Sequence, residues 1–148
     1  MTTFQRKHGS LWLVLLLISL TAPILRAAED EPVPPIVAHM RQINKNLRTL
    51  RGQYDQAALE AENVQLVETI RAHVKAAQQL EPLKTPQIPV DQRAAFLKDF
   101  RSTLGKVLDT LDQLEAALKQ NDSASAKELI LKLNDIKRAG HEKFKSPD

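Results

Sequence analysis

The chain has 148 residues, enough for one domain with a hydrophobic core, and it contains no cysteine. The lack of cysteine excludes disulfides, thiolate metal sites, cysteine nucleophiles and covalent attachment of haem through a C-x-x-C-H motif. With only 4 glycines, 4% aromatic residues and long segments of helical periodicity, the sequence favours an all-α protein.

Residues 1–28 have the pattern of a secretory signal. A positively charged start is followed by an apolar stretch over residues 11–20 and by small residues at a cleavage site. The apolar stretch is shorter than the roughly 18–20 residues that span a bilayer, which disfavours a membrane anchor. The Leu-x-Ala site is imperfect, so an uncleaved anchor is the alternative. We expect cleavage after Ala27 or Ala28, secretion and no membrane association afterwards.

The formal charge of +3 depends on the expected signal. Arg6, Lys7 and Arg26 all lie in it, and taking these three from the 21 basic residues leaves 18, equal to the 18 acidic residues. All acidic residues lie at or after Glu29. The processed chain is therefore formally neutral, with no basic surface that would indicate nucleic acid as a partner.

The first expected helix begins at Pro34 or Pro35, because proline suits a first turn, and ends near Gly52. The second covers about residues 57–80. In both, apolar or small residues recur every three or four positions, which predicts one buried face on each helix. These residues are Ile36, Met40, Ile43, Leu47, Leu50 and Tyr54 in the first helix and Leu59, Asn63, Leu66, Ile70, Val74, Ala77 and Leu80 in the second.

Three prolines in residues 81–90 predict a stiff, non-helical loop. The third helix is expected to start near Asp91, a good N-cap residue. It has the most regular apolar pattern in the chain. This pattern consists of Leu97, Phe100, Leu104, Val107, Leu111, Leu114 and Leu118.

The fourth expected helix covers residues 125–145. Ser125 and Glu128 have the spacing of a capping box, with Asp122 or Ser123 as alternative caps. Its apolar face consists of Ala126, Leu129, Leu133, Ile136, Gly140 and Phe144.

Four amphipathic helices joined by short loops predict an antiparallel up-down-up-down four-helix bundle over residues 29–148. We expect it to be a monomer. In that topology the second turn of the first helix and the last full turn of the fourth lie at similar depth, so Met40 and His141 should face each other. Phe100 points into the same end. A thioether and an imidazole across an apolar slot are typical of a haem pocket with a Met/His axial pair.

The residue pattern alone leaves other interpretations open. Methionine usually fills gaps in cores, and a histidine near a helix C-terminus is usually a surface or capping residue. His39 lies about 100° around the helix from Met40 and should point away from the slot. It is a weak substitute ligand, and His73 is expected at the edge of the core. The sequence has no Glu-x-x-His pair, no phosphate-binding loop and no H-E-x-x-H motif, so we expect no enzyme.

Three segments resemble the cytochrome b562 family. MRQINKNLRTL (40–50) resembles its first helix, with the pattern Met-x-x-x-Asn-x-Asn-Leu. KDFR (98–101) is similar to the start of its third helix, and HEKFK (141–145), eight residues after Leu133, is similar to its final helix. The resemblance covers about residues 33–145.

The resemblance implies a small periplasmic electron-transfer protein that holds one noncovalent haem b. It implies Met40 and His141 as the iron ligands, with five further residues at the haem. These are Asn44, Leu47, Phe100, Leu104 and Lys137. Three positions depart from the family pattern: Lys137 replaces an arginine near a propionate, Leu104 replaces a second phenylalanine, and Gly140 replaces a tyrosine.

The expected partner is a redox protein of unknown identity. The first alternative is a haem-free periplasmic bundle that binds a partner or acts like a chaperone. A soft-metal site for Cu(I) at Met40 and His141 has too few ligands for tight binding. A slow peroxidase-like activity would require Met40 to dissociate.

Overall fold

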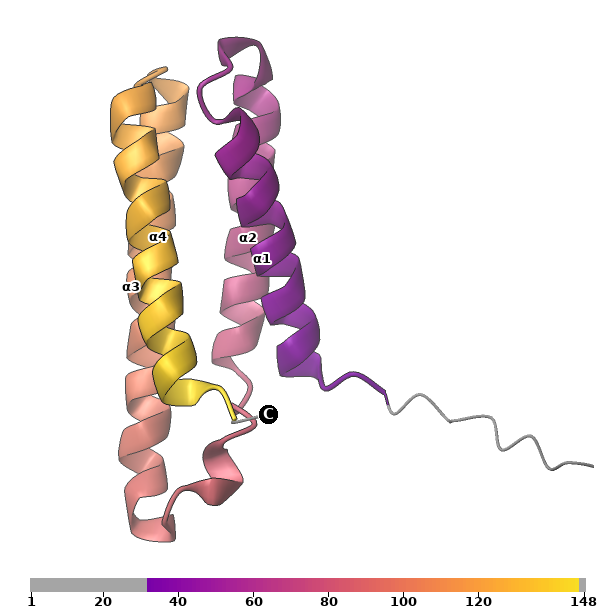
Figure 1. Cartoon of the computed structure of the whole chain (residues 1–148), viewed down its shortest axis with the longest axis vertical. Helices are drawn as coiled ribbons and strands as arrows, with labels where there is room; N and C mark the ends of the chain where they lie inside the picture. Colours follow the sequence, from indigo (N-terminus) through magenta and orange to yellow (C-terminus); the bar gives the residue numbers. More distant parts are fainter. Residues whose placement is uncertain (1–31, 147–148) are drawn as a thin grey trace, which may run out of the picture. The chain divides into compact units, whose positions relative to one another are not determined.

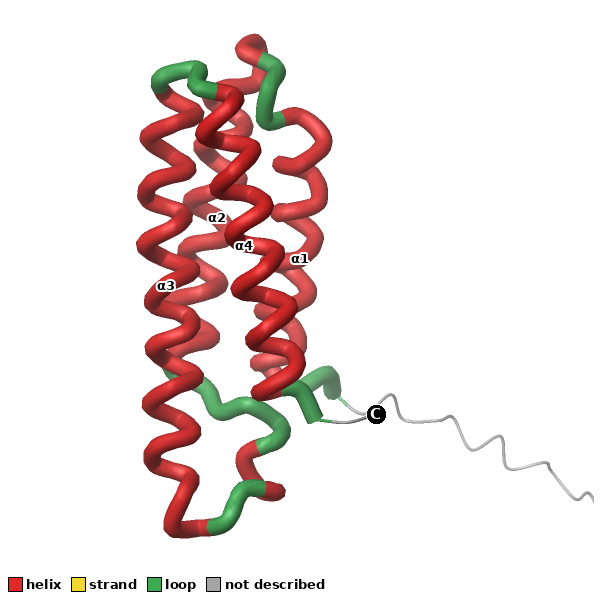
Figure 2. The backbone as a smooth tube through the Cα atoms, turned by 60° about the vertical axis from the view of Figure 1, so that its left-hand side comes forward, coloured by secondary structure: helices red, strands yellow, loops and turns green. Residues whose placement is uncertain are grey.

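The computed structural model describes residues 32–146, so the expected secretory signal lies outside the described part. The described chain forms four α-helices that run alternately up and down (Figures 1 and 2). They are α1 (Pro35–Gln53), α2 (Glu60–Gln78), α3 (Arg93–Lys119) and α4 (Ser123–Phe144). Residues 32–146 contain no strand, which confirms the all-α four-helix bundle. None of these helices combines the length and apolarity needed to cross a bilayer.

The helices pack mainly on their neighbours in the sequence. α1 lies along α2, α2 along α3 and α3 along α4, whereas α1 and α4 touch each other at few positions. Figure 1 shows α1 and α4 diverging toward the end where α1 begins and α4 ends. The first and last helices therefore form the loosest side of the bundle.

Three helix starts differ from the prediction, and two of them, those of α2 and α3, involve 3₁₀ turns. The segment Ala57–Leu59 is a 3₁₀ turn, and α2 begins only at Glu60. Residues Thr85–Gln87 and Val90–Gln92 are also 3₁₀ turns, so the proline-rich loop is not free of helical turns. Asp91 lies inside the second of these turns and is not the N-cap of α3, because Pro89 begins the turn by accepting the Gln92 N–H at 2.9 Å.

The start of α4 resolves the choice of cap. Asp122 is the N-cap, and its carboxylate accepts the Ser125 N–H at 3.0 Å and the Ser125 hydroxyl at 2.6 Å. Hydrogen bonds from Ser125 to the charged form lower the pKa of Asp122. The prediction of a capping box at Ser125 is therefore wrong, and α4 begins two residues earlier than expected.

The core follows the predicted faces with some shifts. Val67 and Ile130 are buried, while the expected Leu66 and Leu129 are only partly buried. Each helix contacts two neighbours, which makes its buried face wider than a single row at three- and four-residue spacing. The most completely buried side chains include Leu50, Ile70, Leu111, Leu114 and Leu133.

Candidate functional site

A cavity of about 300 Å³ lies in the half of the bundle that contains the start of α1 and the end of α4. This volume is at the lower end of the roughly 300–1000 Å³ range of small-molecule and cofactor sites. All four helices and the α2–α3 loop contribute to it. Its apolar wall includes Ile36, Val37, Ile43, Leu47, Val74, Pro82, Leu83, Phe100, Leu104, Val107, Leu133, Ile136 and Phe144.

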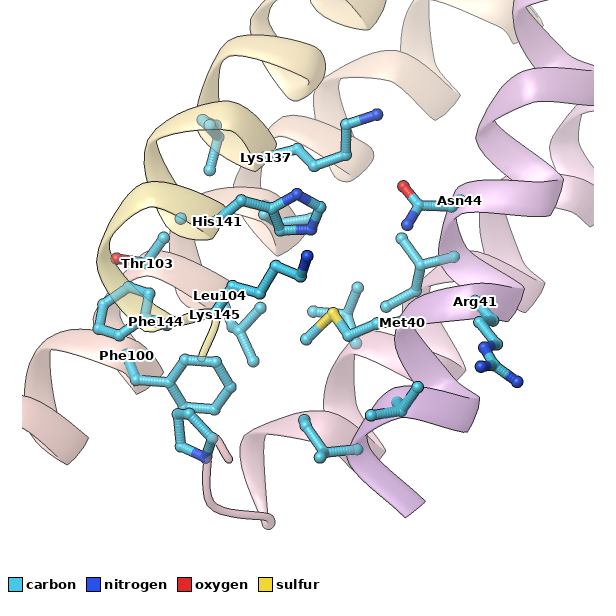
Figure 3. A pocket seen from close by; sticks show the side chains of 18 of the residues that line it. Met40, Arg41, Asn44, Phe100, Thr103, Leu104, Lys137, His141, Phe144 and Lys145 are labelled. Atoms are coloured by element: carbon cyan, nitrogen blue, oxygen red, sulfur yellow. The ribbon is translucent and has the colours of Figure 1, made fainter. Parts of the chain in front are cut away.

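Met40 and His141 project into this cavity from opposite sides (Figure 3). Met40 is on α1 and only partly buried, although it packs against the core. His141 is on the last full turn of α4 and is exposed, because its ring points into the cavity rather than into the packed core. The antiparallel packing thus places the two side chains at similar depth, as the sequence predicts.

The other five predicted residues line the same cavity: Asn44, Leu47, Phe100, Leu104 and Lys137. Asn44 and Leu47 follow Met40 by four and seven positions, so they share its face of α1. The structure brings all seven candidates together around one space. Their role as ligands of a bound group stays a prediction at this point.

The aromatic part of the wall is larger than the sequence analysis expected. Phe100 meets Phe144 edge to face, with ring centroids 5.3 Å apart and planes at 70°. Phe144 also meets Phe96 at 5.2 Å and 62°. Phe144 was predicted on the apolar face of α4 but not at the site. Phe144 follows Gly140 by four residues and Ile136 by eight, and both of these line the cavity. This spacing could have predicted that Phe144 lines the cavity too.

The charged residues that line the cavity are all basic. They are Arg41, Lys137 and Lys145, and no Asp or Glu from residues 32–146 lines it. In Figure 3, Lys137 and Lys145 extend toward the cavity while Arg41 points away. Lys145, which the sequence analysis missed, follows His141 by four residues, as His141 follows Lys137. Lys137 and His141 thus share one face of α4, and Lys145 is the extended C-cap residue that follows Phe144.

This environment acts on the protonation of His141. Burial lowers its pKa, and the nearby charges of Lys137 and Lys145 lower it further. A lower pKa favours the neutral imidazole, which is the form with a free ring nitrogen lone pair for a metal ion. Desolvation and the two lysines thus all favour the form of His141 that can act as a ligand.

Asn44 supplies an unpaired polar group at the cavity wall. Its Oδ1 atom is buried and has no hydrogen-bond partner in the protein. A buried polar atom without a partner costs free energy, and a hydrogen-bond donor at this wall would offset that cost. The cavity is therefore apolar over most of its wall and polar at Asn44 and the two lysines.

His39 does not line the cavity, as its position on α1 predicts. Its Nδ1 atom instead lies 3.0 Å from Nδ1 of His73 on α2. Residues 32–146 contain no group of three or more His, Cys, Asp or Glu side chains that could hold a metal ion.

Fold and cavity together define a class: a four-helix bundle with a mainly apolar cavity among its helices. The sequence model of the family described as cytochrome b562 matches residues 36–145. The chain belongs to the cytochrome b562 family, which confirms the resemblance of its three segments. The family implies haem as the ligand. No curated protein and no solved structure matches the chain.

Proposed function

We propose that the chain binds one noncovalent haem b, with Met40 and His141 as the axial ligands, and carries single electrons in the periplasm. The observation that supports this most is the approach of a thioether and an imidazole into one apolar cavity in a member of this family. Met40 is the only methionine after Met1, so the chain offers no other thioether.

The wall suits both parts of an amphiphilic dicarboxylate such as haem b. Aliphatic and aromatic side chains from α1, α3 and α4 would cover the macrocycle and exclude water from it. Lys137 and Lys145 would pair with propionate groups, and the Asn44 amide offers donors and an acceptor. With no acidic side chain at the wall, nothing in residues 32–146 that lines the cavity would repel these carboxylates.

When bound, haem supplies a reversible one-electron couple. Met40 and His141 would fill both axial positions, leaving no position for a substrate, and we therefore propose an electron carrier rather than an enzyme. The thioether and the apolar wall favour the reduced iron, because neither stabilises additional positive charge. A redox protein would be the partner.

Two departures from the family pattern tune this site rather than remove it. Lys137 is a point charge and holds a carboxylate less rigidly than an arginine fork. Leu104 makes the wall less aromatic than a second phenylalanine would, although the Phe100–Phe144 pair supplies aromatic surface nearby. We expect these changes to affect haem affinity and reduction potential.

The test is a visible absorption titration of the purified protein with haemin, oxidised and then dithionite-reduced. We expect a one-to-one Soret shift and a narrow reduced α-band, lost in Met40→Ala and His141→Ala. His39→Ala is the matched control, because it removes the imidazole next to Met40 without touching the cavity wall. No specific shift in a chain still helical by circular dichroism would overturn the proposal and leave a haem-free binding bundle.

A further inference from the structure

Two of the four histidines form a pair outside the cavity. His39 on α1 and His73 on α2 are 34 positions apart in the sequence, and their Nδ1 atoms are 3.0 Å apart. The ring centroids lie 5.2 Å apart with planes at 52°, and both side chains are half-buried. Neither residue lines the cavity. The packing of α1 on α2 thus brings two imidazole nitrogens within hydrogen-bond distance of each other.

When both rings are neutral, the contact between the two Nδ1 atoms contains one proton. One ring donates its Nδ1–H to the Nδ1 lone pair of the other. If the donating ring changes to the tautomer with its proton on Nε2, both Nδ1 atoms carry a free lone pair. That change moves a proton from one ring nitrogen to the other and releases none overall. Both nitrogens then become available to one cation.

The spacing of the two nitrogens selects the kind of cation. At a metal–nitrogen distance of about 2.0–2.1 Å, two cis ligands at 90° are about 2.8–3.0 Å apart, whereas two tetrahedral ligands are about 3.3 Å apart. The observed 3.0 Å fits the right-angle case. Square-planar or tetragonal nitrogen sites are typical of Cu²⁺ and Ni²⁺, and Cu²⁺ binds more tightly in the Irving–Williams order.

We propose that His39 and His73 form a second metal site, a two-histidine site for Cu²⁺ that joins α1 to α2. Residues 32–146 supply no third His, Cys, Asp or Glu to this pair. Water therefore completes the coordination, and the ion exchanges with solution. The site does not depend on haem, because neither His39 on α1 nor His73 on α2 lines the cavity.

The experiment titrates the haem-free full-length chain with copper(II) sulfate against glycine as a competing chelator. Calorimetry gives stoichiometry and affinity, and electron paramagnetic resonance counts the coordinated nitrogens. We expect one Cu²⁺ per chain, coordinated by two imidazole nitrogens. His39→Gln and His73→Gln should each weaken binding by roughly a hundredfold or more, since even losing an outer partner of a ligand costs about 10–100-fold.

His8→Gln and His141→Gln are the matched controls, because they remove the other two histidines. Both should keep the two-nitrogen signal. Cu²⁺ should also raise the thermal unfolding midpoint of the wild type and of both controls, and not of His39→Gln, because the ion joins two helices only in the folded chain. This second readout separates lost binding from a misfolded variant.

Three results would overturn the site. They are undiminished Cu²⁺ affinity in His39→Gln or His73→Gln, loss of the signal in His141→Gln, and tighter binding of Zn²⁺ than of Cu²⁺. The last would contradict the right-angle geometry itself.

Discussion

The two halves of the bundle are built from the same periodic sequence and pack differently. In the closed half, around Leu50, Val67 and Leu114, the side chains are 0% exposed. In the open half, around Met40 and His141, the helices enclose a cavity of about 300 Å³. Large aliphatic residues from every helix meet in the closed half. The α4 face of the open half instead carries Gly140 and an imidazole, and the α1 face carries Met40 and Asn44.

This difference shows that helical periodicity determines which residues face inward but not whether they meet. Arg71 on α2 also bonds Asp112 and Glu115 on α3, which adds a polar connection beside the closed core. In the open half, α1 and α4 make few contacts with each other. The stability of the haem-free chain should therefore come mainly from the closed half, and ligand-dependent stability from the open half.

The largest expected effect is on the closed half. Leu114→Ala should lower the free energy of unfolding of the haem-free chain by about 2–5 kcal/mol, because it leaves a cavity among fully buried side chains. Met40→Ala should cost clearly less, since Met40 is only partly buried beside an existing cavity. Urea denaturation followed by circular dichroism measures both. Equal losses would contradict the division into two halves.

Haemin binding should change the free energy of unfolding by a similar amount. Haemin at about 100 times its dissociation constant should stabilise the wild type by about 2.7 kcal/mol, because it binds only the folded chain. Leu114→Ala should keep most of this increment, since Leu114 does not line the cavity. His141→Ala should lose it. The measurement is the same urea denaturation with and without haemin, and an increment retained in His141→Ala would argue against that ligand.

A smaller effect is expected at Gly140. Gly140→Ala should stabilise the haem-free chain by about 0.5–1 kcal/mol, because glycine is a poor helix former. The added Cβ would meet Thr103 Cγ2 at 3.9 Å, an ordinary contact. Gly105→Ala on α3 is the matched control, with no atom within 4 Å of its added Cβ and no place in the cavity wall. Both should gain equally in urea denaturation, and a loss at Gly140 alone would mean that the open half needs the glycine.

The smallest effect concerns pH. His141 has a lowered pKa in the folded haem-free chain, so the folded state resists a proton that the unfolded state accepts. Stability is therefore fully present above the unfolded pKa of about 6.5 and falls as the pH drops from there toward the lowered folded pKa. Urea denaturation between pH 7.5 and 5 measures this slope, and His141→Gln should reduce it.

Lys137 provides a sharper test of what lowers the pKa of His141. Lys137→Gln should raise the pKa of His141 toward its ordinary value, because it removes the larger of the two charge effects that lower it. Lys132→Gln, an exposed position elsewhere on α4, should leave it unchanged. A nuclear magnetic resonance titration of the His141 ring protons reports both. An unchanged pKa in Lys137→Gln would mean that the charge of Lys137 does not contribute to it.

The sequence predicts the fold and the depth of the site because both depend on helix period and chain direction. It places Met40, Phe100 and His141 at one end through the antiparallel order of the helices. The prediction of Asp91 as the N-cap of α3 was wrong, because Pro89 begins a 3₁₀ turn that contains Asp91. The His39–His73 contact was not foreseen, since it depends on the rotation of α1 against α2, which a single-helix pattern does not contain.

The weak contact between α1 and α4 has a consequence for folding kinetics. The strong helix contacts join segments adjacent in the sequence, and such local contacts form quickly because little chain entropy is lost in closing them. Only the approach of α1 to α4 brings the two ends of the described chain together. Folding can therefore complete three helix interfaces first and leave this closure for last. A ligand held between Met40 and His141 would stabilise the contact between α1 and α4, which forms last. Ligand binding would therefore slow unfolding far more than it would speed folding.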